Sequence, residues 1–352
     1  MPIVAKNSRK TVMKYLIRSV VSVAIFVLIM EAALVLFAVD PRPKGLDFIV
    51  NRALDYPEAF VKDHDLFWRL RSNRTIVSEF FEGKAYRINR QGFRGADFRM
   101  EKTGVRVAVL GNSCSFGWGV LDDETFADRL QQMLRRRKGF ENAEVYNFSV
   151  PGYTSYQGKI NYRKYIRPYK PDILLVTFAW NDHWLSANKR PDKDQKMPPQ
   201  ALLDVYNVIG RFRFYRLVKG LVFSFHPAAD TLEFSSDLTR VSLDDFQGNL
   251  GQIVDMARQD GVRVILMTSP IPPLESQGDA AGGRLTFSLH NYYNDRTREA
   301  AARYETGLVD LAAIFDQHRN LFDDPRIDPF HYNRQGHAVA AEAIFPVMME
   351  ML

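Results

Sequence analysis

Three residues stand where predicted strands end, and their types could support nucleophilic chemistry. Ser113 follows the apolar run at residues 105–110, and a serine on a strand-to-helix turn presents its hydroxyl near backbone N–H groups that can face negative charge. Gly152, in a Pro-Gly turn, lets a backbone N–H approach a substrate closely. Asn181 can donate to the same oxyanion from its side chain. A parallel sheet would bring all three residues to one edge.

Asp328 and His331 could complete such a site. Three positions separate them, so the acid can hold one ring nitrogen of the imidazole while the other nitrogen points at a nucleophile. Taken singly, each of these groups is most often a turn or a hydrogen-bonding surface residue. Taken in order along the chain, they supply a nucleophile, two oxyanion donors and an acid–base pair, which favours nucleophilic catalysis.

This ordered set resembles the sequence blocks of the SGNH hydrolases, also called the GDSL esterase family, over residues 105–352. The nucleophile block is usually Gly-Asp-Ser and reads Gly-Asn-Ser at 111–113. The glycine block falls on Gly152, and the Gly-x-Asn-Asp block reads Ala-Trp-Asn-Asp at 179–182. The Asp-x-x-His block is Asp328 to His331.

The resemblance implies an enzyme, either a serine hydrolase or an O-acyltransferase, that needs no cofactor. It implies that Ser113 is the nucleophile, that His331 is the general base and then the acid, and that Asp328 orients His331. The implied oxyanion hole combines the backbone N–H groups of Ser113 and Gly152 with the Asn181 side chain. The implied fold is a flavodoxin-like α/β/α sandwich with about five parallel strands.

Two residues depart from the family pattern. Asn112 replaces the usual aspartate and Ala179 replaces the usual glycine, and neither change removes a catalytic group. Asparagine donates a hydrogen bond where aspartate only accepts, so the bonds around Asn112 must differ. Reduced activity is one consequence, and a non-catalytic subunit that binds a glycan or a protein is the alternative from another class.

The other reactive residues favour simpler explanations. Cys114 is the only cysteine, so it cannot form a disulfide within the chain, and we expect it to be a packed small residue. His183 and His337 could bind a metal, but no spacing brings three ligands together. The sequence therefore predicts no metal site.

The elements that position these residues alternate between strand and helix after residue 104. The strands are predicted from short apolar runs at residues 105–110, 144–148, 173–178, 262–268 and 307–311. The helices are predicted at residues 123–137, from about 155, at 243–259, 295–304 and 336–349. Buried runs between helices indicate a parallel sheet covered on both faces.

Two further segments complete the predicted organisation of the domain. Residues 40–104 are expected to form a connecting module that contains a short hairpin or an arm laid against the main body. Residues 184–241 interrupt the alternation within the catalytic domain at 105–352. We expect this insertion, with its aromatic-rich helical piece at 201–225, to pack over one edge of the sheet.

Composition and charge exclude several classes of protein. Apolar residues make up 46% and charged residues 25% of the chain, as in ordinary globular proteins, which excludes disorder and a disulfide scaffold. The net charge of +6 comes from a basic N-terminal tail, and the remaining charges nearly balance. The totals therefore give no indication of a nucleic-acid partner. The basic tail residues are Lys6, Arg9, Lys10, Lys14 and Arg18.

Residues 19–39 are apolar except for Ser22 and Glu31, and are long enough to cross a bilayer. The basic tail at 1–18 precedes them, while Asp40, Arg42, Lys44 and Asp47 nearly cancel after them. The positive-inside rule then predicts a single-pass anchor in a bacterial inner membrane with the catalytic domain in the periplasm. A cleaved signal peptide is the alternative, although the run is longer than usual and residues 36–38 make a poor cleavage site.

Glu31 has two interpretations within this apolar run. It is either an acid that reaches the outer interface or stays protonated, or a polar contact with another membrane helix. Location and resemblance together favour O-acetyl groups of a cell-envelope or exported polysaccharide as substrate, or another small ester. A related alternative is an O-acetyltransferase that works with a membrane-bound O-acyltransferase partner.

Overall fold

The computed structural model describes residues 2–39, 41, 58–77, 83–184, 186, 190–224, 239–272, 281–318, 320–323, 328 and 330–352. The chain forms two compact units. The smaller combines residues 1–58 with 199–232, and the larger combines residues 59–198 with 233–352. The charges expected to balance one another after the apolar run, at Asp40, Arg42, Lys44 and Asp47, lie outside the described residues.

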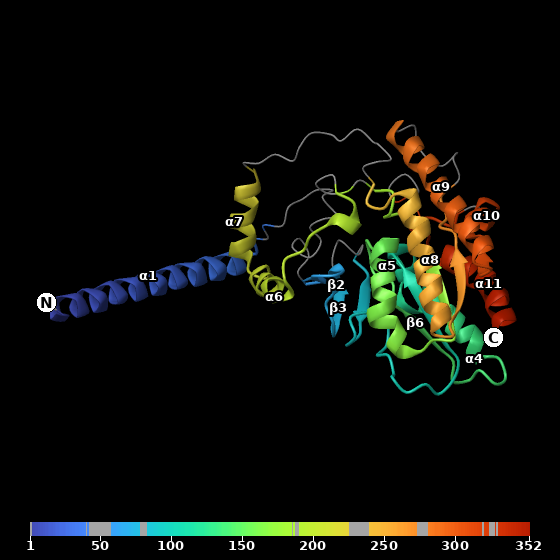
Figure 1. The fold of residues 1–352 in the computed structure, drawn as a ribbon, viewed down its shortest axis with the longest axis horizontal. Coiled ribbons are helices and arrows are strands. Elements are labelled where there is room, and N and C mark those ends of the chain that lie inside the picture. The colour runs from blue at the N-terminus through green and yellow to red at the C-terminus, as the bar shows by residue number, and fades with distance from the viewer. Residues whose placement is uncertain are drawn as a thin grey trace. The chain divides into compact units, whose positions relative to one another are not determined.

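The larger unit contains a five-stranded parallel sheet with the order β6-β5-β7-β8-β9 (Figure 1). The strands are β5 Arg106–Gly111, β6 Glu144–Asn147, β7 Ile173–Thr177, β8 Arg263–Met267 and β9 Gly307–Val309. Every residue of β5 and β7 is buried, which is why these strands appear in the sequence as continuous apolar runs. The first strand lies beside the second and the third, as in flavodoxin-like sheets. The predicted α/β fold class is confirmed.

Helices cover both faces of this sheet (Figure 1). On one face, Val107 and Val109 of β5 belong to the same hydrophobic cluster as Leu130 of the flanking helix. That side is formed by α4 Phe126–Arg135, α10 Leu311–Asp316 and α11 Arg334–Met351. The other side is formed by α5 Ser155–Asn161, α8 Leu243–Gln259 and α9 Ala281–Arg303. The helix predicted at 295–304 is therefore longer, because α9 begins at Ala281 and continues through the two glycines that follow.

Two short hairpins precede the sheet, where the sequence predicted one. In the first, β1 Phe60–Asp63 pairs antiparallel with β2 Phe67–Leu70. In the second, β3 Arg74–Val77 pairs with β4 Ala85–Ile88. A bridge between Arg94 and Asn147 connects the end of this segment to the edge strand β6. The segment thus belongs to the larger unit.

The smaller unit contains α1 Pro2–Leu36, α6 Gln200–Ile209 and α7 Arg213–Ser224. Helices α6 and α7 group with α1 in the smaller unit, and the expectation that residues 201–225 pack over an edge of the sheet stays a prediction. The physical reason for this grouping lies at the start of α7, whose first N–H groups need acceptors. The Glu31 carboxylate of α1 accepts from Arg213 N at 3.0 Å and from Phe214 N at 2.8 Å.

Candidate active site

Ser113 is the first residue of a one-turn helix, α3 Ser113–Phe116, that directly follows β5. Gly111 permits this sharp turn, since a Cβ there would lie 2.2 Å from Ser115 Oγ and 2.5 Å from Thr177 O. Asn112 caps the helix, and its Oδ1 accepts from Cys114 N at 3.0 Å. The turn therefore holds the Ser113 hydroxyl at the carboxyl end of the sheet.

Asn112 performs the capping role that an aspartate could also fill. The difference lies in its second side-chain atom, because Asn112 Nδ2 is buried and has no hydrogen-bond partner in the described part of the chain. An unsatisfied buried donor typically costs about 1–3 kcal/mol. The replacement of aspartate thus affects the stability of the turn and leaves the three reactive side chains in place.

Ser113, His331 and Asp328 form one hydrogen-bonded chain. His331 Nε2 lies 2.7 Å from Ser113 Oγ, and His331 Nδ1 lies 2.7 Å and 2.9 Å from the two oxygens of Asp328. Trp118 stacks on the imidazole, with ring centroids 5.3 Å apart and planes 22° apart. The His331 side chain is 13% exposed, so a substrate could still reach it.

Asp328 is held as a carboxylate. Burial alone would raise its pKa, but the charge and hydrogen bond of His331 and the N–H groups of Phe330 and His331 together lower the pKa below its usual value. Both N–H groups lie 3.1 Å from Asp328 Oδ1. A carboxylate accepts from His331 Nδ1, which leaves Nε2 free to accept the Ser113 hydroxyl proton.

The expected oxyanion donors lie on the loops that follow β6 and β7, the two strands beside β5. Val150 N donates to Gly111 O at 3.2 Å, so the loop after β6 runs beside the end of β5. Gly152 has a φ of +84°, which favours glycine. Among the described residues, neither Ser113 N nor Gly152 N has a hydrogen-bond acceptor. Asn181 Nδ2 donates to Tyr153 O at 3.1 Å, and its second hydrogen remains available.

The Gly152 loop is held from one side by Trp68 of the first hairpin. Trp68 Nε1 donates to Pro151 O at 3.1 Å, and Tyr153 OH donates to Trp68 O at 2.7 Å. Trp68 lies in the predicted connecting module at 40–104, for which the sequence indicated no role at the site. Its aromatic neighbour Phe67 is the local signal in the sequence.

Arg240 holds the same loop from another side, and no motif in the sequence indicated this role. Its Nη1 donates to Gly152 O at 2.8 Å. Its Nε and Nη2 donate to the two oxygens of Asp192 at 3.0 Å and 2.8 Å, and Nη2 also donates to Gln157 Oε1 at 2.9 Å. Arg240 is only 4% exposed, so this guanidinium is a fixed part of the wall behind Gly152.

The turn that carries Asn181 is strained at Ala179 and fixed by Asp182. Ala179 has a φ of +116°, a region that favours glycine, which accounts for the glycine usual at this position. Asp182 accepts from Ala179 N at 3.1 Å and from Ser155 N at 2.8 Å. Burial raises the pKa of Asp182 to about 7, although its hydrogen bonds with Ser155 and Ala179 act in the opposite direction.

The remaining candidates from the sequence lie in the core. His183 Nε2 lies 3.0 Å from His290 Nδ1, and His337 Nδ1 accepts from Phe126 N at 3.2 Å. Burial lowers the pKa of all three imidazoles, that of His290 to about 4. Cys114 is also buried, and burial raises the pKa of its thiol. No group of three metal-ligating side chains is found in the described part of the chain.

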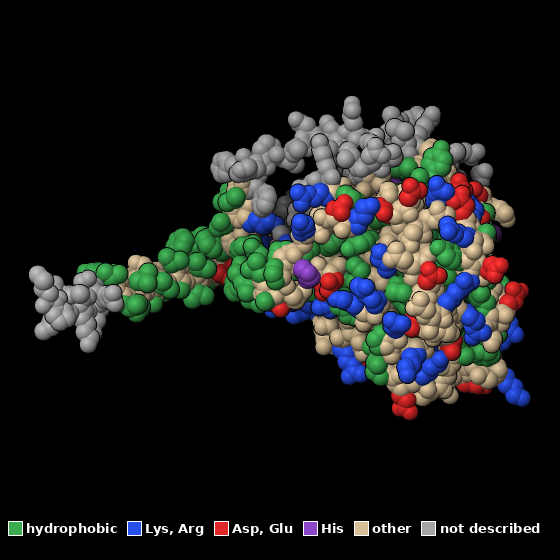
Figure 2. Space-filling model, in the orientation of Figure 1, with side chains coloured by type: hydrophobic (Ala, Val, Ile, Leu, Met, Phe, Trp, Pro, Cys, Tyr) green, Lys and Arg blue, Asp and Glu red, His purple; other side chains and the backbone are tan. Residues whose placement is uncertain are grey.

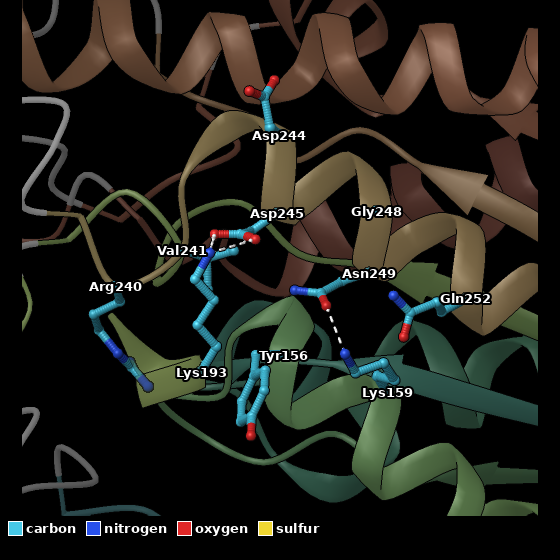
Figure 3. Close-up of a pocket in the computed structure, with 10 residues that line it drawn as sticks. All are labelled: Tyr156, Lys159, Lys193, Arg240, Val241, Asp244, Asp245, Gly248, Asn249 and Gln252. Atoms are coloured by element: carbon cyan, nitrogen blue, oxygen red, sulfur yellow. Dashed lines mark hydrogen bonds and ion pairs between the residues drawn. The ribbon is translucent and has the colours of Figure 1, made fainter. Parts of the chain in front are cut away.

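A polar cavity of about 150 Å³ lies elsewhere in the larger unit, along α5 and α8 (Figure 3). Its two lysines are paired. Lys159 donates to Asn249 Oδ1 at 3.0 Å, and Lys193 lies 2.8 Å from Asp245. The cavity includes Arg240 in its lining but none of Ser113, Asp328 and His331. The hydrogen-bonded chain at the sheet edge is therefore the better candidate site.

A serine, a histidine and an aspartate joined by hydrogen bonds are the arrangement of a serine-dependent hydrolase. Here the three residues lie at the carboxyl edge of a parallel sheet between helices. The family model described as GDSL-like Lipase/Acylhydrolase matches residues 109–339, and the chain belongs to this family. The protein is thus an enzyme of the lipase/acylhydrolase class and an SGNH hydrolase, as the sequence blocks predicted.

Solved structures that are similar to the chain include three hydrolases. LAE5, an alpha/beta hydrolase enzyme from the metagenome of Lake Arreo in Spain, is 18% identical with a TM-score of 0.46, over 72% of this chain and 99% of its own. The lipase/acylhydrolase from Enterococcus faecalis is 16% identical with a TM-score of 0.46, over 70% and 95%. Axe2, an acetylxylan esterase from Geobacillus stearothermophilus, is 16% identical with a TM-score of 0.44, over 70% and 96%. No curated protein matches the chain.

Proposed function

We propose that this enzyme transfers acyl groups through a covalent acyl-Ser113 intermediate. The 2.7 Å contact between Ser113 Oγ and His331 Nε2 is the observation that carries the proposal. Ser113 Oγ attacks the carbonyl carbon of an ester while His331 Nε2 takes the hydroxyl proton. The proton then passes to the oxygen of the leaving alcohol as the tetrahedral intermediate collapses. Asp328 keeps the imidazole oriented and stabilises its positive charge.

The negative charge on the carbonyl oxygen is stabilised by three donors in this proposal. They are the backbone N–H groups of Ser113 and Gly152 and the Nδ2 group of Asn181. Support comes from the absence of acceptors for the two backbone groups among the described residues. Removal of one such donor typically costs about 10²–10³ in kcat.

In the second half of the reaction, water or a sugar hydroxyl attacks the acyl-enzyme. His331 Nε2 takes a proton from this acceptor and returns it to Ser113 Oγ as the new product leaves. We propose an acylated carbohydrate as substrate, with O-acetyl groups of a cell-envelope or exported polysaccharide as the particular case. This choice follows from the proposed location of the enzyme.

The proposed location is the bacterial inner membrane, with the larger unit on the periplasmic side. The 25 residues from Val12 to Leu36 form a helix that is long and apolar enough to cross a membrane. A signal sequence has the same properties, and the length of the run favours an uncleaved anchor. The basic residues of the tail then keep the N-terminus in the cytoplasm: Lys6, Arg9 and Lys10 precede this segment, and Lys14 and Arg18 lie in its first two turns.

A related alternative is an O-acetyltransferase that transfers the acetyl group to a sugar together with a membrane-bound O-acyltransferase. In the sequence, Glu31 was the residue that favoured such a partner. In the structure this carboxylate accepts hydrogen bonds from Arg213 N and Phe214 N of the same chain. Glu31 therefore no longer favours a partner protein, and hydrolysis is the simpler proposal.

A serine-reactive fluorophosphonate tests the proposed nucleophile on the full-length protein in detergent. We expect the probe to modify the peptide that contains Ser113, and to modify nothing in Ser113→Ala. Ser115→Ala is the matched control, because Ser115 is buried two positions away and its hydroxyl donates to Asn112 O. Cleavage of p-nitrophenyl acetate should follow the same pattern. Normal labelling and turnover in Ser113→Ala would exclude this mechanism.

A further inference from the structure

Helix α6 presents an apolar face to its surroundings. Leu202, Val205 and Val208 are 46%, 51% and 57% exposed. Gln200 and Asp204 form a polar stripe beside them, with Asp204 about 100° around the helix from Val205, and are hydrogen-bonded to each other at 2.8 Å. Helix α6 therefore carries an apolar stripe beside a polar one, and the apolar stripe is exposed although its residues are hydrophobic. Figure 2 shows hydrophobic side chains on this helix and along α1.

Helix α7 has the same organisation with a basic polar face. Val218, Leu221 and Val222 share one side at helical spacing and are 42%, 56% and 54% exposed. The other side carries positive charge at every third position, and α7 contains no acidic residue. The basic residues are Arg213, Arg216 and Lys219. An apolar face opposite a basic face is the composition of a helix that lies in a membrane interface.

Helices α1 and α7 are joined by hydrogen bonds at their ends, so the position along α1 at which α7 begins is fixed. The Glu31 carboxylate accepts from the first N–H groups of α7, and Arg213 Nη1 donates to Leu34 O and Val39 O at 3.0 Å each. Phe26 and Phe214 also pack edge to face at 5.9 Å. Glu31 precedes the end of the apolar helix at Leu36 by about 7.5 Å. Interfacial helices are typically buried by about 5–10 Å.

We infer that α6 and α7 are interfacial helices that bind the surface of the phospholipid bilayer. Their apolar faces enter the acyl boundary of the leaflet in which α1 ends, and the basic face of α7 meets anionic headgroups. This inference rests on the proposed membrane anchor. It adds an attachment through residues 199–232, which join the larger unit at both of their ends.

Single cysteines labelled with an environment-sensitive dye test this surface on the full-length protein in vesicles of phosphatidylcholine and phosphatidylglycerol. The natural Cys114 is 3% exposed and does not compete for the label. We expect labels at Val205→Cys and Val218→Cys to be quenched several-fold more by shallow spin-labelled lipid than the label at Asp204→Cys. The Asp204 variant is the matched control on the polar stripe of the same helix, and iodide in the water should quench it most strongly.

A label at Val23→Cys in α1 separates this inference from the anchor on which it rests. If that label is quenched by deep spin-labelled lipid while those at positions 205 and 218 are quenched by iodide, the interfacial surface is wrong and the anchor stands. If the label at position 23 is also in water, the anchor itself is wrong. Labels at 205 and 218 that are shielded from both quenchers would show a protein-covered face, which also overturns the inference.

Glu31→Ala tests the capping contact in the same vesicles. We expect iodide quenching at position 218 to rise about two-fold, because the start of α7 loses its acceptors, while quenching at position 23 stays unchanged. Unchanged quenching at position 218 would show that Glu31 does not hold α7 in place.

Discussion

The Ser113 side of the site and the Gly152 side differ in how the chain positions them. On the Ser113 side, each residue is fixed by its immediate neighbours: Asn112 caps the nucleophile turn, and Asp328 is hydrogen-bonded to N–H groups two and three positions away. On the Gly152 side, the loop is held by Trp68 and Arg240, both more than 80 positions distant. Each reactive residue is thus fixed within its own loop, although Ser113 and His331 meet across 218 positions, whereas the Gly152 loop is fixed by residues distant in the sequence.

The largest expected effect comes from the local side. Asp328→Asn keeps the size of the side chain but removes the carboxylate that accepts from His331 Nδ1, so the imidazole can adopt the wrong tautomer. We expect kcat for p-nitrophenyl acetate to fall by about 10⁴-fold with little change in the folded structure. Steady-state kinetics and circular dichroism measure the two quantities. A loss of less than ten-fold would remove Asp328 from the proposed mechanism.

The second effect concerns the histidines, because the one at the site is paired with a carboxylate and three others are buried in the core. His331 is paired with a carboxylate, while His183, His290 and His337 are buried with pKa values that burial lowers from 6.5. A lowered pKa for a base means that the folded state prefers the neutral form. Each buried neutral imidazole therefore makes its full contribution to the free energy of unfolding above about pH 6.5. That contribution is lost as the pH falls toward 4, and for His290 alone the loss is about 3 kcal/mol.

Asp182 opposes this trend, because its raised pKa favours the folded state as the pH falls from about 7 towards 3.8. With three buried imidazoles against one carboxyl, we expect the melting temperature in detergent to be lower at pH 5 than at pH 7. His290→Gln should reduce the difference, and His318→Gln, at an exposed position, should leave it unchanged. A melting temperature that rises on acidification would contradict this assignment of charge states.

The third effect probes the distant side of the site. Arg240→Lys cannot bridge both Asp192 oxygens and Gly152 O, since lysine lacks the planar fork of arginine. We expect kcat to fall about ten-fold with KM little changed, because the loop that carries an oxyanion donor moves. The matched control is Arg298→Lys, at another Arg–Asp pair with contacts of 2.8 Å and 3.0 Å to Asp310. Equal effects of the two substitutions would mean that Arg240 supports only stability.

The smallest effect concerns the strained turn beside Asn181. Ala179→Gly relieves the positive φ, and we expect the free energy of unfolding to rise by about 1 kcal/mol, less the entropy cost of glycine. Ala340→Gly, a buried alanine inside α11, should instead lower stability. Thermal denaturation of the two variants should therefore shift in opposite directions. A shared downward shift would show that Ala179 is not strained.

Much of the fold could be predicted because buried parallel strands are apolar along their whole length, and β5 and β7 fall within two residues of the predicted runs. Ser113, Asp328 and His331 could be singled out by residue type and order. Arg240 could not, since a buried ion pair leaves no periodic pattern in the sequence. The grouping of α6 and α7 with α1 could not be predicted either, because an amphipathic pattern does not show which apolar surface the helix contacts.

In the proposed mechanism the acyl group is carried on Ser113 as a covalent acyl-enzyme. Trapping this acyl-enzyme is the most direct test of the mechanism. Full-length enzyme in detergent is mixed with p-nitrophenyl acetate, stopped with acid in the first turnover, digested and examined by mass spectrometry. We expect an acetyl group on Ser113, present in the wild type and absent from Ser113→Ala. An acetyl group on another residue, or full turnover in Ser113→Ala, would contradict it.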